Sequence, residues 1–102
     1  MYAVIFRARL KPAMLQQPDP EYATTAAAMR QRAFERYGCL DFSAVTEGDQ
    51  EIAVSWWPSQ QAIQQWQQDE LHQQAQQLGK QRWYASYHVD VVAVERQYQQ
   101  VL

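Results

Sequence analysis

The residues best suited to chemistry lie between Glu51 and Tyr87. All four tryptophans of the chain and one of its two histidines, His72, fall in this stretch. A neutral imidazole accepts a proton near neutral pH, and a helix N-terminus favours the neutral form. His72 is therefore the candidate general base. The alternative is structural, with His72 capping or crosslinking locally to Asp69, three residues before it.

Aromatic side chains provide the candidate binding surface. Trp66 lies six residues before His72, and its indole could stack on a flat aromatic ligand and donate one hydrogen bond. Because Trp66 shares an apolar stripe with Ala62 and Ile63, plain core packing is the alternative. The further residues predicted to line a pocket are Phe6, Phe42, Trp56, Trp57, Trp83, Tyr84 and Tyr87. Trp56 and Trp57 are neighbours in a predicted strand, so they must point to opposite faces of it.

Other reactive groups are few. Arg7 or Arg9 could meet an anionic group of a ligand, or could end as solvated or interfacial charges. Cys39 is the only cysteine, so an intramolecular disulfide and a cysteine-based metal site are both excluded. With no base adjacent in sequence, Cys39 is predicted to be a buried, inert thiol. No phosphate-binding loop, metal-spaced carboxylate set or nucleophile elbow is present, and we predict no metal site.

The composition predicts one globular domain spanning residues 1–102. Hydrophobic residues make up 47% of the chain and aromatic residues 13%, which argues against disorder. The formal net charge of -2 gives no reason to expect nucleic acid or an anionic membrane as a partner. No leader and no apolar run of roughly 20 residues is visible, so we expect a soluble, cytoplasmic protein.

Strand and helix signals alternate along the chain. Residues 2–10 alternate as a strand, and two prolines mark residues 11–18 as a loop. Asp19, Pro20 and Glu21 form a strong helix start, and Gly38 ends that helix as a left-handed cap. Residues 40–45 and 52–56 then alternate around a turn at 47–50, which predicts an antiparallel hairpin. A helical pair follows over 59–81, in which Trp66 closes the first piece and Asp69 caps the second, and a strand runs over 84–96.

This order predicts an α+β, ferredoxin-like βαββαβ fold with both main helices on one face of an antiparallel sheet. The other face would then lack a cover. The strands nevertheless carry apolar residues at positions that face both sides of the sheet. A solvated face would instead be polar at every second position. A second copy of the chain, burying of order 800 Å² per partner, would cover that face. We therefore predict a homodimer through the open sheet face, with one of Trp56 and Trp57 in its interface.

Several local patterns carry a family resemblance. They are Gly38-Cys39-Leu40, the hairpin ending in Trp57-x-Ser59, Ala62-Ile63-x-x-Trp66, Asp69-x-x-His72 and Gly79-x-x-x-Trp83-Tyr84-x-x-Tyr87. Together they resemble the antibiotic biosynthesis monooxygenase family of dimeric α+β barrels, over nearly the whole chain.

The resemblance implies a pocket between helices and sheet in each protomer, with Trp66 at the position of a pocket tryptophan. Its oxygenase members act on quinols and anthrones without a cofactor. By that resemblance, His72 would take a proton from a phenol or enol, and the resulting carbanion would reduce dioxygen without metal or flavin.

Haem-degrading relatives instead need a histidine about one turn beyond His72 and an asparagine on the first strand. Gln76 and Phe6 or Arg7 stand there in this chain. Two hypotheses therefore remain: a cofactor-independent monooxygenase acting on a small electron-rich aromatic or quinol, and a non-catalytic dimer that binds a small molecule in the same pocket. Haem binding through a shifted ligand at His72 is a third and weaker one.

Overall fold

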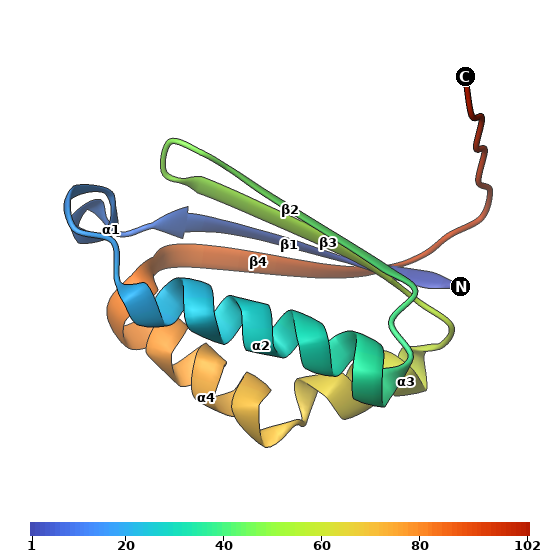
Figure 1. Cartoon of the computed structure of the whole chain (residues 1–102), viewed down its shortest axis with the longest axis horizontal. Helices are drawn as coiled ribbons and strands as arrows, with labels where there is room; N and C mark the ends of the chain where they lie inside the picture. The colour runs from blue at the N-terminus through green and yellow to red at the C-terminus, as the bar shows by residue number, and fades with distance from the viewer.

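A four-stranded antiparallel sheet, with its main helices on one face, forms the protein in a computed structural model that describes residues 1–102 (Figure 1). The strands are β1 (Tyr2–Leu10), β2 (Asp41–Glu47), β3 (Gln50–Trp57) and β4 (Tyr84–Ala93), in the spatial order β2-β3-β1-β4. The helices are α1 (Pro12–Gln16), α2 (Pro20–Tyr37), α3 (Gln60–Gln67), α4 (Glu70–Leu78) and the π-helical turn η1 (Gly79–Trp83). The predicted ferredoxin-like architecture is confirmed. No helix combines the length and apolar character that crossing a membrane requires.

Local signals at the ends of α2 act as the sequence predicts. The Asp19 carboxylate accepts a hydrogen bond from the amide of Glu21 at 3.0 Å, and Pro20 is the first helical residue. Gly38 has a φ of 73°, a left-handed conformation that ends the helix at little cost only for glycine. α2 therefore has a defined start and stop, which fixes the position of its inner face over the sheet.

Two of the predicted element boundaries are wrong. Residues 12–16 form the short helix α1 rather than a continuous loop, because Pro12 suits a first helical turn and Met14 is buried against Leu10 and Trp83. The last strand ends at Ala93 rather than Arg96. Its partner strand β1 begins at Tyr2, which pairs with Ala93. Beyond that pair only the amide of Val94 bonds across, to the carbonyl of Met1 at 3.0 Å, because the chain begins there and β1 offers no further partner. The rest of the chain leaves the sheet as an extended tail (Figure 1).

The main core joins the helices to the sheet. Trp57, on the inner face of β3, is fully buried, and its ring centroid lies 4.9 Å from that of Trp66 on α3. The Trp57 indole N–H donates to the hydroxyl of Ser55 at 2.8 Å, so this buried polar atom is satisfied. The other buried members of this cluster are Val4, Ala33, Cys39 and Ile63.

Asp69, at the junction of α3 and α4, links three helices. Its carboxylate accepts a hydrogen bond from the amide of Leu71 at 2.8 Å, which caps α4. It also accepts hydrogen bonds from Arg32 at 2.8 Å and from the Tyr37 hydroxyl at 2.6 Å, both on α2. Burial by itself raises the pKa of Asp69, but the bonds from Tyr37, the Leu71 amide and Arg32 outweigh burial and hold the pKa below its usual range.

Replacing Asp69 by alanine should therefore lower the free energy of unfolding by about 3 kcal/mol, because a helix cap and two hydrogen bonds to a charged group are lost together. Urea denaturation followed by circular dichroism measures this difference. The matched control is Asp49→Ala, which removes an exposed ion pair to Arg9 and should cost about 1 kcal/mol or less. Equal losses for the two variants would show that Asp69 does not join the helices in the way described.

Candidate functional site

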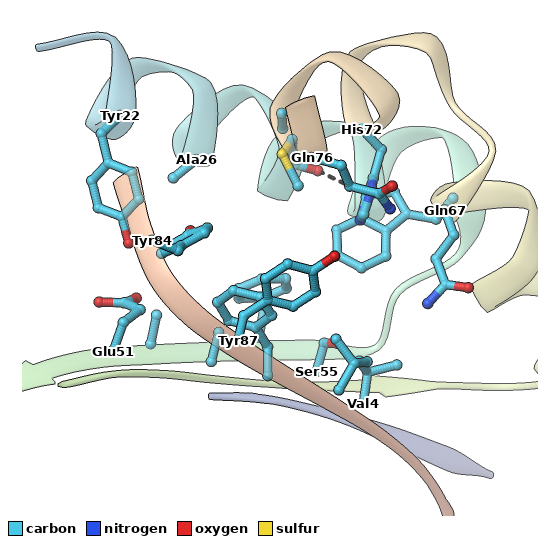
Figure 2. Close-up of a pocket in the computed structure, with 18 residues that line it drawn as sticks. Val4, Tyr22, Ala26, Glu51, Ser55, Gln67, His72, Gln76, Tyr84 and Tyr87 are labelled. Atoms are coloured by element: carbon cyan, nitrogen blue, oxygen red, sulfur yellow. Dashed lines mark hydrogen bonds between the residues drawn. The ribbon is translucent and has the colours of Figure 1, made fainter. Parts of the chain in front are cut away.

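A largely apolar cavity lies between the inner face of the sheet and helices α2 and α4 (Figure 2). Its volume is about 190 Å³, and 13 of its 18 lining residues are hydrophobic. Pockets for drug-sized ligands span about 300–1,000 Å³, so this cavity suits a small ring system. Tyr87 and Val89 of β4 line it while remaining 44% and 41% exposed, so the cavity opens to solvent there.

Six of the nine residues predicted for the site line this cavity: Phe6, Phe42, Trp66, His72, Tyr84 and Tyr87. Trp56, Trp57 and Trp83 do not. Trp57 points inward but lies behind Trp66 in the core, and Trp56 therefore points to the outer face of the sheet. Trp83 packs with Leu10 and Met14 in a second cluster.

His72 and Trp66 form the centre of the candidate site. The imidazole stands edge-on to the indole, with ring centroids 4.5 Å apart and an interplanar angle of 82°. The indole N–H donates to the carbonyl of Met29 at 3.2 Å, so this donor is already used and the prediction that it would bind a ligand is not supported. Trp66 offers the cavity its ring instead.

The surroundings of His72 favour its neutral form. Burial lowers its pKa below the usual value of 6.5, although a backbone hydrogen bond and the charge of Asp69 act in the opposite direction. Gln76, one turn further along α4, places its amide nitrogen 3.2 Å from Nδ1. The amide donates to Nδ1, which leaves the ring proton on Nε2. Gln76 thus holds the tautomer and the orientation of the ring.

Tyrosines line the other end of the cavity. Burial raises the pKa of Tyr84 far above its usual range, and the neighbouring Tyr22 and Glu51 act in the same direction. The Tyr84 ring also packs edge-on to Phe6, with centroids 5.4 Å apart. A Cβ at Gly79 would come within 2.8 Å of the Tyr84 ring, so only glycine there allows this ring position. Gly79 does not line the cavity itself, but it allows the Tyr84 ring to take its place in the cavity wall.

Glu51 and Tyr22 are lining residues that the sequence analysis missed, together with Met29, Ser55, Gln67 and Gln76. Glu51 is only 9% exposed. The sequence could have indicated Glu51. It lies six residues before Trp57 on β3, so both side chains point to the same inner face, where a charged residue is unusual. Helical spacing similarly places Gln76 on the same face of α4 as His72.

The other predicted reactive groups lie outside the cavity. Arg7 and Arg9 point to the outer face of the sheet, where they pair with Asp90 at 3.5 Å and Asp49 at 2.8 Å. Cys39 is buried in the main core, and burial raises the pKa of its thiol, which keeps it protonated and inert. No group of three or more His, Cys, Asp or Glu side chains is arranged to hold a metal ion.

Comparison with known proteins places these features in a family context. The family model described as antibiotic biosynthesis monooxygenase matches residues 1–78. Over 97 residues the chain is 38% identical to the uncharacterized protein YqjZ of Bacillus subtilis (strain 168), covering 94% of this chain and 81% of that protein.

Solved structures with low sequence identity share the fold. Rv0793 from Mycobacterium tuberculosis superposes with a TM-score of 0.79 at 15% identity, covering 96% of this chain and 98% of that one. A variant of SnoaB, a cofactor-independent oxygenase from Streptomyces nogalater, gives a TM-score of 0.76 at 9% identity, with 97% of each chain covered. At these identities the likeness establishes the architecture alone.

The electrostatics of His72 lead to a testable titration. Its pKa, measured by NMR, should lie below 6.5, and Asp69→Asn should lower it further because the carboxylate charge now favours the imidazolium. Since the unfolded chain binds the proton more tightly, His72 should contribute stability above pH 6.5 that is lost as the pH falls below that value. The variant His72→Gln assigns the signal. A midpoint at or above 6.5 would contradict the burial described.

Proposed function

Because the chain belongs to the antibiotic biosynthesis monooxygenase family, we propose that it is a cofactor-independent monooxygenase acting on a small electron-rich aromatic or quinol. The observation that carries this proposal is the neutral His72 standing against Trp66 in an aromatic cavity. A base whose pKa lies near or below the working pH is available for proton abstraction without prior deprotonation. The cavity walls are suited to a flat ring that stacks on them.

The proposed reaction needs only substrate and dioxygen. His72 removes a proton from an activated phenol or enol, and the resulting carbanion transfers an electron to dioxygen. The two radicals combine with a new C–O bond, and the resulting peroxide takes back the proton held by His72. The hydroperoxide then loses water as its O–O bond breaks, and the same carbon gives up its second hydrogen as a proton. One oxygen atom ends as a carbonyl of the product and the other as water, and the substrate supplies all the electrons.

The cavity residues would have distinct roles in this reaction. The Gln76 amide contacts Nδ1 of His72, so a substrate hydroxyl would compete with it for the same nitrogen. Nδ1 is then the atom that accepts the proton, while Nε2 keeps its own. The rings of Trp66 and Phe42, with centroids 6.2 Å apart, would hold the substrate plane in place. The apolar lining would strengthen the interaction between the anion and the imidazolium.

Oxygen uptake by the purified protein tests the proposal. Reduced anthrones, quinols and naphthols are supplied without added metal or flavin. His72→Ala should reduce uptake by roughly 100-fold or more, the usual contribution of a general base, while leaving the circular dichroism spectrum unchanged.

Gln74→Ala, an exposed position on the same helix, is the matched control and should keep full activity. Uptake that survives in His72→Ala would exclude His72 as the base. Ligand binding without uptake for every compound would favour the non-catalytic, small-molecule-binding function for the same cavity.

We also propose that the protein is a homodimer joined through the outer face of the sheet. That face carries a contiguous apolar region from β1, β3 and β4, which no helix covers (Figure 1). Its members include Ala3, Ile5, Ile52, Val54, Trp56 and Val92. A face of this kind is usually covered by protein rather than by water.

Charges on the same face are balanced, which suits packing against an identical copy. Arg7 pairs with Asp90 at 3.5 Å, and Nε2 of His88 lies 3.3 Å from the same carboxylate. Because the Arg7 cation and the Asp90 anion lie side by side, a two-fold contact can bring opposite charges together. Both the apolar and the charged parts of this face therefore support the proposed two-fold contact.

Placing a charge in the apolar region should separate the protomers. Val54→Glu is expected to elute as a monomer by size-exclusion chromatography with light scattering, whereas the unmodified protein elutes as a dimer. Gln64→Glu, which adds the same charge on the exposed surface of α3, should remain dimeric. A monomeric unmodified protein, or a dimeric Val54→Glu variant, would refute this interface.

A further inference from the structure

Glu51 is the one carboxylate among the residues that line the cavity, and no lysine or arginine lines it. It is 9% exposed, and no lysine or arginine lies within ion-pair distance of it. Its hydrogen bond comes from the hydroxyl of Thr46 on the neighbouring strand, which reaches Oε2. The other carboxylate oxygen, Oε1, has no protein donor. A buried carboxylate without a counter-ion is costly, and a cation from outside would relieve that cost.

Aromatic rings surround this end of the cavity. Tyr22 and Tyr84 lie edge-on with centroids 6.0 Å apart. Burial is the largest cause that raises the pKa of both hydroxyls, and the negative charge of Glu51 raises each pKa further. Phe6 stacks with Tyr87 at 6.0 Å beside them. Faces of aromatic rings attract cations, and a nearby carboxylate adds a charge-assisted hydrogen bond. The combination of rings and one carboxylate is the chemistry that recognises an ammonium group.

The position of Glu51 relative to His72 defines the shape of a ligand that meets both. Figure 2 shows Glu51 with Tyr22 at one end of the cavity and His72 with Gln76 at the other. Glu51 and Ser55 both line the cavity and lie four residues apart on β3, so the cavity extends over about 13 Å of that strand. One aromatic ring with a short side arm spans such a distance.

We propose that Glu51, with Tyr22 and Tyr84, binds a protonated amine of the ligand, so that the preferred substrate is a phenol or quinol with a short alkylamine arm. This inference rests on the proposed function, because the phenol would lie against Trp66 and His72. The amine would donate to Oε1 of Glu51 and lie against the tyrosine rings. Glu51 is then a specificity residue, because it rejects analogues without a cation rather than taking part in oxygen chemistry.

Calorimetric titration with a matched pair of ligands tests the proposal. The two probes are 4-(3-aminopropyl)phenol and 4-butylphenol, which differ in an ammonium group against a methyl group. The amine should bind at least about tenfold more tightly to the unmodified protein. Glu51→Gln, which keeps an oxygen for the Thr46 hydroxyl, should reduce that preference to about threefold or less.

The control is Glu47→Gln, an exposed carboxylate on the same hairpin, which should keep the full preference. Comparing the two probes on the unmodified protein needs no variant, so the proposal is testable even if Glu51→Gln folds poorly.

Equal or weaker binding of the amine, or a preference that persists in Glu51→Gln, would overturn the amine subsite alone. Failure of both probes to bind would overturn the subsite and the use of this cavity together. A Glu51-dependent preference without oxygen uptake would retain the subsite and remove the monooxygenase reaction.

Discussion

The packing of Trp66 against Trp57 is the contact on which the site depends. Trp57 is fixed in the sheet and fully buried, so its partner ring sets where α3 lies over β3. Aromatic pairs of this kind contribute about 0.5–1.5 kcal/mol beyond the area they bury. Trp66 lies in the last turn of α3, Asp69 follows three residues later to cap α4, and His72 then falls in the first turn of that helix. One aromatic contact thus places the candidate base over the sheet.

Much of the fold could be predicted because its signals are local. Asp19 and Gly38 mark the ends of α2 by their own capping chemistry, and both act in the structure as expected. The hairpin and the order of elements follow from alternation and turn residues in the same way. The end of β4 could not be predicted from local signals, because it depends on Tyr2 of β1 rather than on residues near Ala93. Boundaries of this kind are set by tertiary pairing.

Membership of the cavity was harder to predict than the fold for a related reason. Trp57 and Trp83 carry the same aromatic signal as Tyr84 and Tyr87, yet they fill the core because neighbouring helices close over them. A residue type shows that a side chain will be buried, but not whether it will face another side chain or a space. Glu51 is the opposite case, since its charge at an inward position is informative without any knowledge of the cavity.

Alternation in the strands gives the sheet two separate uses. On β1, Val4 and Phe6 face the cavity, whereas Ile5 and Arg7 between them face outward. A change that loosens the outer face would therefore act on the cavity through the backbone of β1 and β3 rather than through any shared side chain. Because β1 and β3 are the central strands, their backbones are hydrogen-bonded to a neighbouring strand on both sides. The cavity can then vary in its lining, at Glu51 or Tyr84, without altering the surface on which a second copy would pack.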